Sequence, residues 1–222
     1  VQLIGEARRI AEKRGTELTG ILPGWKVESL ARQAIESGCD RVIVVEDPRL
    51  EFYTSRPFTK IMATLRWKFN PEVILFGASK NGRDLGGRLH AAIDTGLAAD
   101  CVRFDVTEEG FLDMIRPAFG GKSLAHIHCE EHRPQMASAR WNVFPTPTRD
   151  PTRQGEVVRE TVPLEDADFD TRIVDFKPTA SHETRKIDDA KVLISGGFGL
   201  GDPKNFALLE EFAGLVGGAV AS

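Results

Sequence analysis

The sequence predicts an α/β protein whose main domain is a parallel sheet covered by helices. Unbroken apolar runs such as residues 41–45 (RVIVV) are typical of strands that are buried on both faces. Segments with helical apolar spacing alternate with these runs, as in proteins built from successive βαβ units. After residue 99 this alternation gives way to short strand-like stretches without helices, so we expect an added antiparallel block.

The first half of the chain supplies the alternating elements. Ile4, Ala7, Ile10 and Ala11 share one face at helical spacing, so the chain opens on a helix, and we expect a strand to precede it. Helices are expected over residues 3–13, 27–37 and 59–69, and strands over residues 17–22, 41–45 and 72–76. A further helix begins near Gly82, after a glycine-containing turn.

The second half is richer in strands. Antiparallel strands are expected over residues 101–106, 111–117, 124–129 and 136–140, followed by an exposed loop over 146–156. Two more strands are expected over 157–162 and 172–176, with an acidic solvated turn at 165–170 between them. Residues 178–189 are interpreted as a linker to a last strand at 192–194. The expected domains are residues 1–180, a partner-docking α/β domain, and residues 181–222, the incomplete start of a nucleotide-binding domain.

Composition narrows the functional class. The 222 residues carry a net charge of −4 with acids and bases interleaved, which argues against a nucleic-acid partner. Three widely spaced cysteines indicate a reducing compartment, and we expect a cytoplasmic protein. No apolar run approaches the roughly 20 residues that a membrane span needs. We expect the chain to be a fragment that is cut at both ends.

A histidine-rich stretch is a candidate metal site. His126, His128, Cys129 and His132 are residue types that bind zinc or copper. If residues 124–129 form a strand, His126 and His128 share one face and Cys129 lies on the other. At most two ligands then converge before His132, so we expect no metal site.

The turn from Gly77 to Arg83 allows two interpretations. A glycine-containing turn between a strand end and a helix start is where parallel α/β folds bind anions, and Arg83 and Arg88 would add positive charge. The same glycines could serve only to permit tight packing. Both interpretations stay open at this point.

The glycine turn near the end of the chain is the third candidate. Gly196, Gly197, Gly199 and Gly201 follow the last strand, but Asp202 stands where the dinucleotide-binding fingerprint has its third glycine. Asp202 and Pro203 are instead a helix start, with Asp202 as the cap. We expect the amides of residues 199–201 to face an anion.

Four blocks resemble the alpha subunits of electron transfer flavoproteins, including the Fix-type alpha chains. They are VILFGASKNGRDLGGRLHAAIDTGLAADC, RPAFGGKSLAHI, HRPQMASAR and ISGGFGLGDPKNFALLEEFAGLVGGAVAS. The resemblance implies a first domain that packs against a beta subunit, which holds AMP or a second FAD. It also implies a second domain that binds FAD. The flavin would pass electrons between dehydrogenases and a quinone reductase or another acceptor, without a substrate reaction of this chain's own.

The resemblance also implies which residues contact the flavin. They are Gly197, Phe198, Gly199, Leu200 and Ser222, while most of the FAD site would lie beyond Ser222. Members of the family usually carry arginine where this chain has Phe198, so the ordinary flavin contact is in doubt. Two alternatives remain: a nucleotide-binding enzyme that uses the Gly77–Arg83 turn, and an assembly module that has lost its cofactor.

Overall fold

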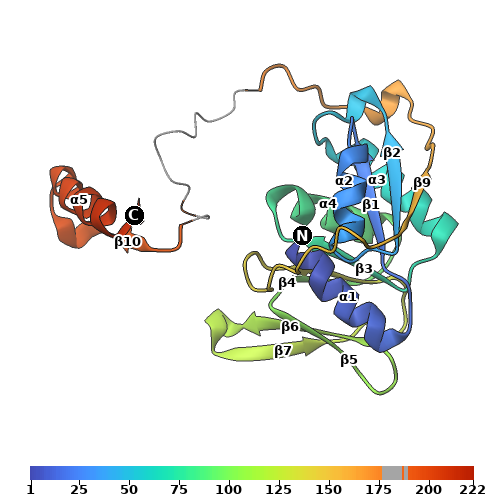
Figure 1. The fold of residues 1–222 in the computed structure, drawn as a ribbon, viewed down its shortest axis with the longest axis horizontal. Helices are drawn as coiled ribbons and strands as arrows, with labels where there is room; N and C mark the ends of the chain where they lie inside the picture. The colour runs from blue at the N-terminus through green and yellow to red at the C-terminus, as the bar shows by residue number, and fades with distance from the viewer. Residues whose placement is uncertain (177–186, 188–189) are drawn as a thin grey trace. The chain divides into compact units, whose positions relative to one another are not determined.

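The computed structural model describes residues 1–176, 187 and 190–222, and these form two compact units, Val1–Arg172 and Ile173–Ser222 (Figure 1). The first unit contains every element up to β9, and the second contains β10, α5 and β11. Within the described residues, no helix has the length and apolar character that crossing a bilayer requires.

The helices and most parallel strands of the first unit follow the predicted order with shifts at their ends, but the parallel strand over residues 97–101 was not predicted. The helices are α1 (Gln2–Arg14), α2 (Glu28–Glu36), α3 (Ser55–Phe69) and α4 (Lys80–Ala92). The first strands are β1 (Thr19–Gly24), β2 (Arg41–Glu46) and β3 (Val73–Gly77). The remaining strands are β4 (Leu97–Cys101), β5 (Arg103–Val106), β6 (Leu112–Ala118), β7 (Ser123–Ile127), β8 (Gln135–Ala139) and β9 (Glu156–Arg159). The prediction of an α/β fold is confirmed.

Two three-stranded sheets are entirely parallel. One has the order β1-β2-β9, with Ile43 of β2 opposite both Ile21 and Val158. The other has the order β3-β8-β4, so that β8 is its central strand.

The antiparallel block is smaller than predicted. It consists of β5, β6 and β7, and the prediction that residues 136–140 belong to it is wrong. All five residues of β8 are buried, because β8 lies between β3 and β4 and is covered on both faces. Gln135 and Ser138 interrupt the apolar residues of β8 (QMASA), so the strand lacks the unbroken apolar run that identifies a strand buried on both faces.

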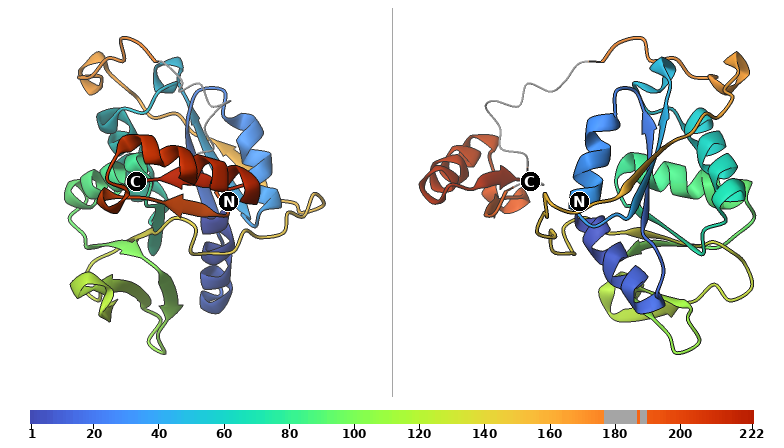
Figure 2. Two further views of the ribbon diagram at one scale, coloured as in Figure 1. Left: turned by 90° about the vertical axis from the view of Figure 1, so that its left-hand side faces the viewer. Right: turned by 45° about the vertical axis from the view of Figure 1, so that its right-hand side comes forward.

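Helices cover both faces of the parallel strands, as the right-hand view of Figure 2 shows. Alternate residues of β2 divide between the faces: Val42 and Val44 pack with α2, and Ile43 and Val45 pack with α3. Helix α4 packs with α3 over β3 and β8. On the other face of those strands, α1 packs together with the antiparallel sheet around Phe104 and Met114. This arrangement gives the unit a conventional helix–sheet–helix core.

The segment after β9 differs from the prediction. The predicted strand over residues 172–176 is wrong, because these residues form no ladder in the structure. The acidic stretch forms a short 3-10 turn (Asp166–Asp168), and Asp168 pairs with Lys60 at 2.7 Å. The predicted linker lies outside the described residues, apart from Ile187.

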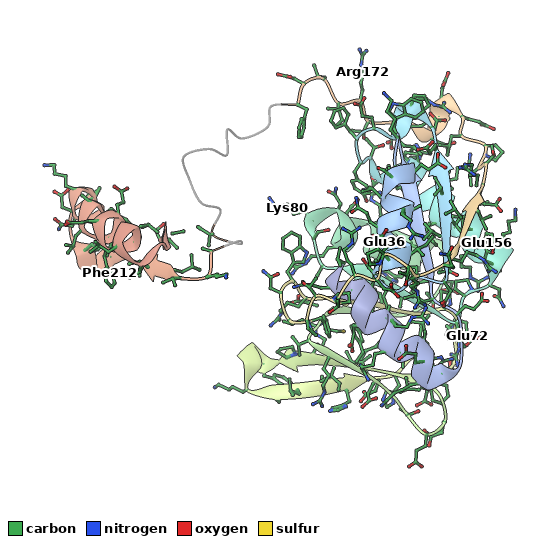
Figure 3. All side chains as sticks on the ribbon, viewed as in Figure 1. Glu36, Glu72, Lys80, Glu156, Arg172 and Phe212 are labelled. Atoms are coloured by element: carbon green, nitrogen blue, oxygen red, sulfur yellow. The ribbon has the colours of Figure 1, made fainter. Side chains whose placement is uncertain are left out.

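The loop before β9 is held against α2. Glu36, labelled in Figure 3, accepts hydrogen bonds from Arg149 through its side chain and from the amide of Asp150 through its carbonyl oxygen. Arg153 pairs with Asp40 at 2.7 Å. The loop is largely exposed, as predicted, but these ion pairs fix its path into β9.

Asp40 connects three distant parts of the first unit. Its carboxylate accepts hydrogen bonds from Arg8 of α1 at 2.5 Å, from the Leu18 amide at 2.8 Å and from Arg153 at 2.7 Å. Burial opposes ionisation, but these hydrogen bonds outweigh it and hold the pKa of Asp40 below its usual value. The ionised carboxylate therefore stabilises the fold.

Replacing Asp40 by Asn is expected to lower the free energy of unfolding by about 1–2 kcal/mol at pH 7, a value reduced for partial exposure. Because the folded-state pKa is lowered, this contribution is fully present above the unfolded pKa of about 3.9 and is lost as pH falls through the folded value. Urea denaturation of both proteins at several pH values should show the difference narrowing below about pH 4. Asp166→Asn is the control, since the Asp166 side chain is fully exposed. An equal loss in both variants would contradict the role given to Asp40.

Candidate functional site

The second unit is a single strand–helix–strand motif. Strand β10 (Leu193–Ser195) pairs in parallel with β11 (Ala219–Ala221), and helix α5 (Phe206–Val216) packs on both. Phe212, labelled in Figure 3, lies on α5. Two 3-10 turns, η5 (Phe198–Leu200) and η6 (Pro203–Asn205), join β10 to α5. A turn at the carboxyl end of a parallel strand is where α/β folds bind ligands.

Glycine is favoured at two positions of this turn for different reasons. The amide of Gly196 donates to the carbonyl of Ala221 at 3.0 Å, which continues the strand pairing into the turn. A Cβ atom at Gly196 would lie 2.4 Å from a methyl carbon of Leu200 and equally close to one of Leu209. Gly201 has φ = 73°, in the left-handed region that glycine adopts at little cost.

The amides that remain free differ from those predicted. Leu200 donates to the carbonyl of Gly197 at 3.0 Å, and Gly201 donates to that of Phe198 at 3.1 Å. The expectation that the amides of residues 199–201 all face an anion is therefore wrong for two of them. Among the described residues, the amides of Gly197, Phe198 and Gly199 have no hydrogen-bond acceptor. The first amides of a helical turn always lack an internal partner, and this general rule could have located them.

The predicted helix start is confirmed. The Asp202 carboxylate accepts a hydrogen bond from the Lys204 amide at 2.9 Å, and Pro203 occupies the first position of the turn. The Asn205 side chain donates to the carbonyl of Leu200 at 2.6 Å and ties the two turns together. These contacts stabilise the turn.

The structure brings the five predicted site residues to one edge. Ser195 lies opposite Ala221 in the parallel pairing, so Gly197 through Leu200 and Ser222 all follow the carboxyl ends of adjacent strands. Space is open around the Cα atoms of Gly197 and Gly199. The Phe198 side chain is fully exposed, and the Leu200 side chain lies against Gly196. This edge offers an anion three free amides and offers a planar ring one exposed aromatic side chain.

The turn from Gly77 to Arg83 is built for packing. The Ser79 hydroxyl accepts a hydrogen bond from the Gly82 amide at 3.1 Å, so it caps α4 where an anion would otherwise bind. A Cβ atom at Gly82 would lie only 2.0 Å from the carbonyl oxygen of Gly77. Arg83 donates to the carbonyl of Ala78 and pairs with Asp100. Of the two interpretations left open by the sequence, these contacts favour tight packing.

The histidine-rich strand is organised around a carboxylate that the sequence did not reveal. His126 Nδ1 lies 2.8 Å and His128 Nε2 lies 3.1 Å from the two oxygens of Asp113 on β6. Cys129 turns away and contacts the carbonyl of His132. No group of three or more His, Cys, Asp or Glu side chains within the described part of the chain is arranged to hold a metal. The register pairs Met114 with Ile127, so Asp113 lies across from His128 and diagonal to His126. This strand pairing was not part of the prediction from the sequence.

The other two cysteines belong to the core. Burial raises the pKa of the Cys39 thiol and that of the Cys101 thiol to about 11 each. Both thiols are therefore protonated at neutral pH and are poor nucleophiles.

Comparison with known proteins gives one consistent result. Residues 1–165 match the family model described as "Electron transfer flavoprotein domain". The chain is 38% identical over its full length to the electron transfer flavoprotein subunit alpha of Thermoanaerobacterium thermosaccharolyticum, covering 67% of that protein. It is 40% identical to Protein FixB of Clostridium saccharobutylicum, covering 66% of it. It is 34% identical to the acryloyl-CoA reductase electron transfer subunit beta of Anaerotignum propionicum, covering 68% of it. The chain thus spans about two thirds of the length of these curated relatives.

Proposed function

The chain belongs to the electron transfer flavoprotein family, and on this premise we propose that it works in a heterodimer as the alpha subunit, which holds FAD. In this role it carries electrons between dehydrogenases and a quinone reductase or another acceptor, and it converts no substrate of its own. The observation that carries the proposal is the edge formed by residues 197–200 and Ser222 in the second unit. The compact arrangement of free amides and one exposed aromatic ring suits a flavin nucleotide.

The residues present fit part of an FAD site. The free amides of Gly197, Phe198 and Gly199 are suited to bind a negatively charged group. The open space around Gly197 and Gly199 leaves room for that group. The exposed Phe198 ring is suited to contact with an aromatic ring system. When bound, FAD supplies the redox chemistry, while the protein supplies position and electrostatics.

The first unit is proposed to bind the beta subunit. Its antiparallel hairpin exposes Phe119 in the turn between β6 and β7 and Leu124 near the start of β7, at 87% and 53% of their maximal area. A contiguous apolar patch exposed on a protein surface is typical of an interface. An obligate contact of this kind would bury more than about 2,000 Å².

The proposal is tested by counting cofactors. The complete subunit, purified with its beta partner, is expected to contain FAD, together with AMP or a second FAD in the partner. The 222-residue chain alone is expected to show no FAD binding at micromolar concentration by flavin fluorescence. Three exposed amides at about 0.5–1.5 kcal/mol each and a helix dipole of about 0.3–1 kcal/mol fall short of the roughly 8 kcal/mol required.

Two results would contradict these expectations. A colourless heterodimer with no bound flavin would instead favour a cofactor-free assembly module. Tight FAD binding by the 222 residues alone would show that the amides of residues 197–199 and Phe198 account for much more of the affinity than proposed here.

A further inference from the structure

The small antiparallel sheet of the first unit ends in a strand that has a free edge. Strand β7 is the last strand in the order β5-β6-β7, and β6 is its one neighbour among the described strands (Figure 1). The Ile115 carbonyl oxygen of β6 accepts a hydrogen bond from the Val102 amide at 2.8 Å, so the backbone polar groups of Ile115 face away from β7. His126 lies directly opposite Ile115, and in such a pair both residues turn their N–H and C=O groups away from each other. Because these groups alternate along a strand, the backbone groups of both Leu124 and His126 face the free edge.

This edge lacks the features that normally protect a strand from pairing. Residues 123–127 (SLAHI) contain no proline and no acidic or basic residue other than histidine, and their register with β6 has no bulge. Leu124 is 53% exposed and the His126 side chain is 52% exposed, so the described part of the chain leaves this edge uncovered. Soluble proteins usually shield such an edge, because its unpaired N–H and C=O groups are a template for another strand. The edge therefore has the properties of a pairing site.

The turn that leads into β7 holds an exposed aromatic ring at a conformational cost. Phe119, in the turn Phe119–Gly121, has φ = 50°, a left-handed conformation that is unfavourable for a residue of its size. Its side chain is nevertheless 87% exposed, so contacts within this chain do little to offset that cost. Backbone strain of this kind concentrates at functional sites. Phe119 and Leu124 lie at the same end of the hairpin, so a partner that pairs with the edge can also cover both side chains.

Charges of opposite sign stand at the two ends of the edge. Lys122 precedes β7, while Glu130 and Glu131 follow it, and all three residues are exposed. Within the described part of the chain, none of the three side chains forms an ion pair. A complementary strand therefore carries an acidic residue near Lys122 and a basic residue near Glu130, with an apolar residue beside Leu124.

A second copy of this chain does not supply that complement. If two β7 edges paired antiparallel about His126, Lys122 of one copy would lie opposite Glu130 of the other, which is favourable. The same pairing would direct Phe119 and Leu124 of one copy toward the polar residues that follow β7 in the other, and their apolar surface would stay unmatched. The combined pattern of charge and apolar surface thus fits a different chain.

We propose that an extended strand of the beta subunit pairs with the free edge of β7 through the backbone of Leu124 and His126. This inference rests on the heterodimer proposed above and names the part of the first unit that makes the contact, together with the mode of contact. The added strand continues the sheet beyond β7, and its apolar side chains cover Phe119 and Leu124. In this mode the backbone hydrogen bonds supply affinity, while the side chains and the charged ends supply specificity.

The first test compares two substitutions at His126 in the complete alpha subunit mixed with its beta subunit. His126→Pro removes the N–H that faces the free edge, and proline is tolerated at an edge position whose N–H faces away from the neighbouring strand. His126→Val keeps that N–H and is favourable in a strand. Both variants lose the imidazole contact with Asp113, so the difference between them reports on the backbone alone. By titration calorimetry, we expect His126→Pro to weaken subunit association at least about tenfold and His126→Val to change it less than about threefold.

Hydrogen exchange in the unchanged protein tests the proposal without a substitution. The amides of Leu124 and His126 are expected to exchange at least about tenfold more slowly in the heterodimer than in the free alpha subunit. The Ala125 amide already faces β6, so its exchange rate should change less, and it serves as the internal control.

Three outcomes would overturn the proposal. Equal weakening by both variants would assign the contact to the imidazole and not to strand pairing. Unchanged exchange at Leu124 and His126 in a stable heterodimer would place the interface elsewhere. A dimer of the alpha subunit alone that His126→Pro abolishes would show that a second copy pairs with the edge. Failure of the unchanged subunits to associate would contradict the proposed heterodimer itself, whereas the first two outcomes contradict only this mode of contact.

Discussion

Replacing Gly82 by Ala is expected to lower the free energy of unfolding by about 3 kcal/mol or more, the upper range for overpacking a core. The Cβ atom of alanine would lie 2.0 Å from the carbonyl oxygen of Gly77, which belongs to β3. This oxygen is a backbone atom and cannot rotate away, so either α4 or the end of β3 must move. Urea denaturation followed by tryptophan fluorescence reports the loss, because all three tryptophans lie in the first unit.

Gly87→Ala is the matched control within the same helix. A Cβ atom at Gly87 meets nothing within 4 Å. Alanine also has a higher helix propensity than glycine, so this variant should gain about 0.5–1 kcal/mol. The two substitutions have identical chemistry and opposite expected signs. If both variants gain stability, the close approach of α4 to β3 is not a constraint on the fold.

Replacing Phe198 by Arg in the complete heterodimer is expected to raise the reduction potential of the flavin by about 30–60 mV. A cation at this exposed position favours the negative charge that flavin acquires on reduction. A differential interaction of about 1.4 kcal/mol corresponds to about 30 mV for a two-electron couple and about 59 mV for a one-electron couple. FAD affinity should change less, since most contacts of a complete site do not involve this side chain. Spectroelectrochemical titration gives the potential, and flavin fluorescence gives the affinity.

The Phe198→Leu variant separates the effect of an added charge on the flavin from the effect of losing the aromatic ring. Leucine removes the aromatic ring without adding charge, so it should weaken FAD binding while leaving the potential near that of the unchanged protein. A potential that is the same in all three proteins would place Phe198 away from the flavin. A shift of equal size in both variants would show that the ring, and not the added charge, sets the potential.

Local patterns were sufficient for most of the first unit's helices and parallel strands. The apolar spacing of Ile4, Ala7 and Ile10 predicted α1, and the run RVIVV predicted β2, because both signals depend on residues within a few positions of one another. The turn after β10 was equally accessible, since the cap at Asp202 and proline at the next position need no distant partner. The candidate site residues were located by resemblance to a family. The pairing of β10 with β11 in the structure then showed that these residues lie together at one edge.

Long-range contacts decided the rest. The sequence QMASA carries too little apolar signal to show that β8 is a central strand, and only burial between β3 and β4 makes it one. Arg8, Asp40 and Arg153 are separated by many residues, so their ion pairs have no signature in the sequence. The contacts of Asp113 with His126 and His128 depend on the positions of side chains across two strands.

The sequence by itself thus determined most of the helices and strands and where the glycine turn lies, because propensity, periodicity and capping act between near neighbours. Only the tertiary structure decided which strands are neighbours and which amides of the turn stay free. The physical reason is that strand pairing and burial depend on surfaces supplied by residues far away in the chain. The same apolar strand can therefore lie at an edge or at the centre of a sheet.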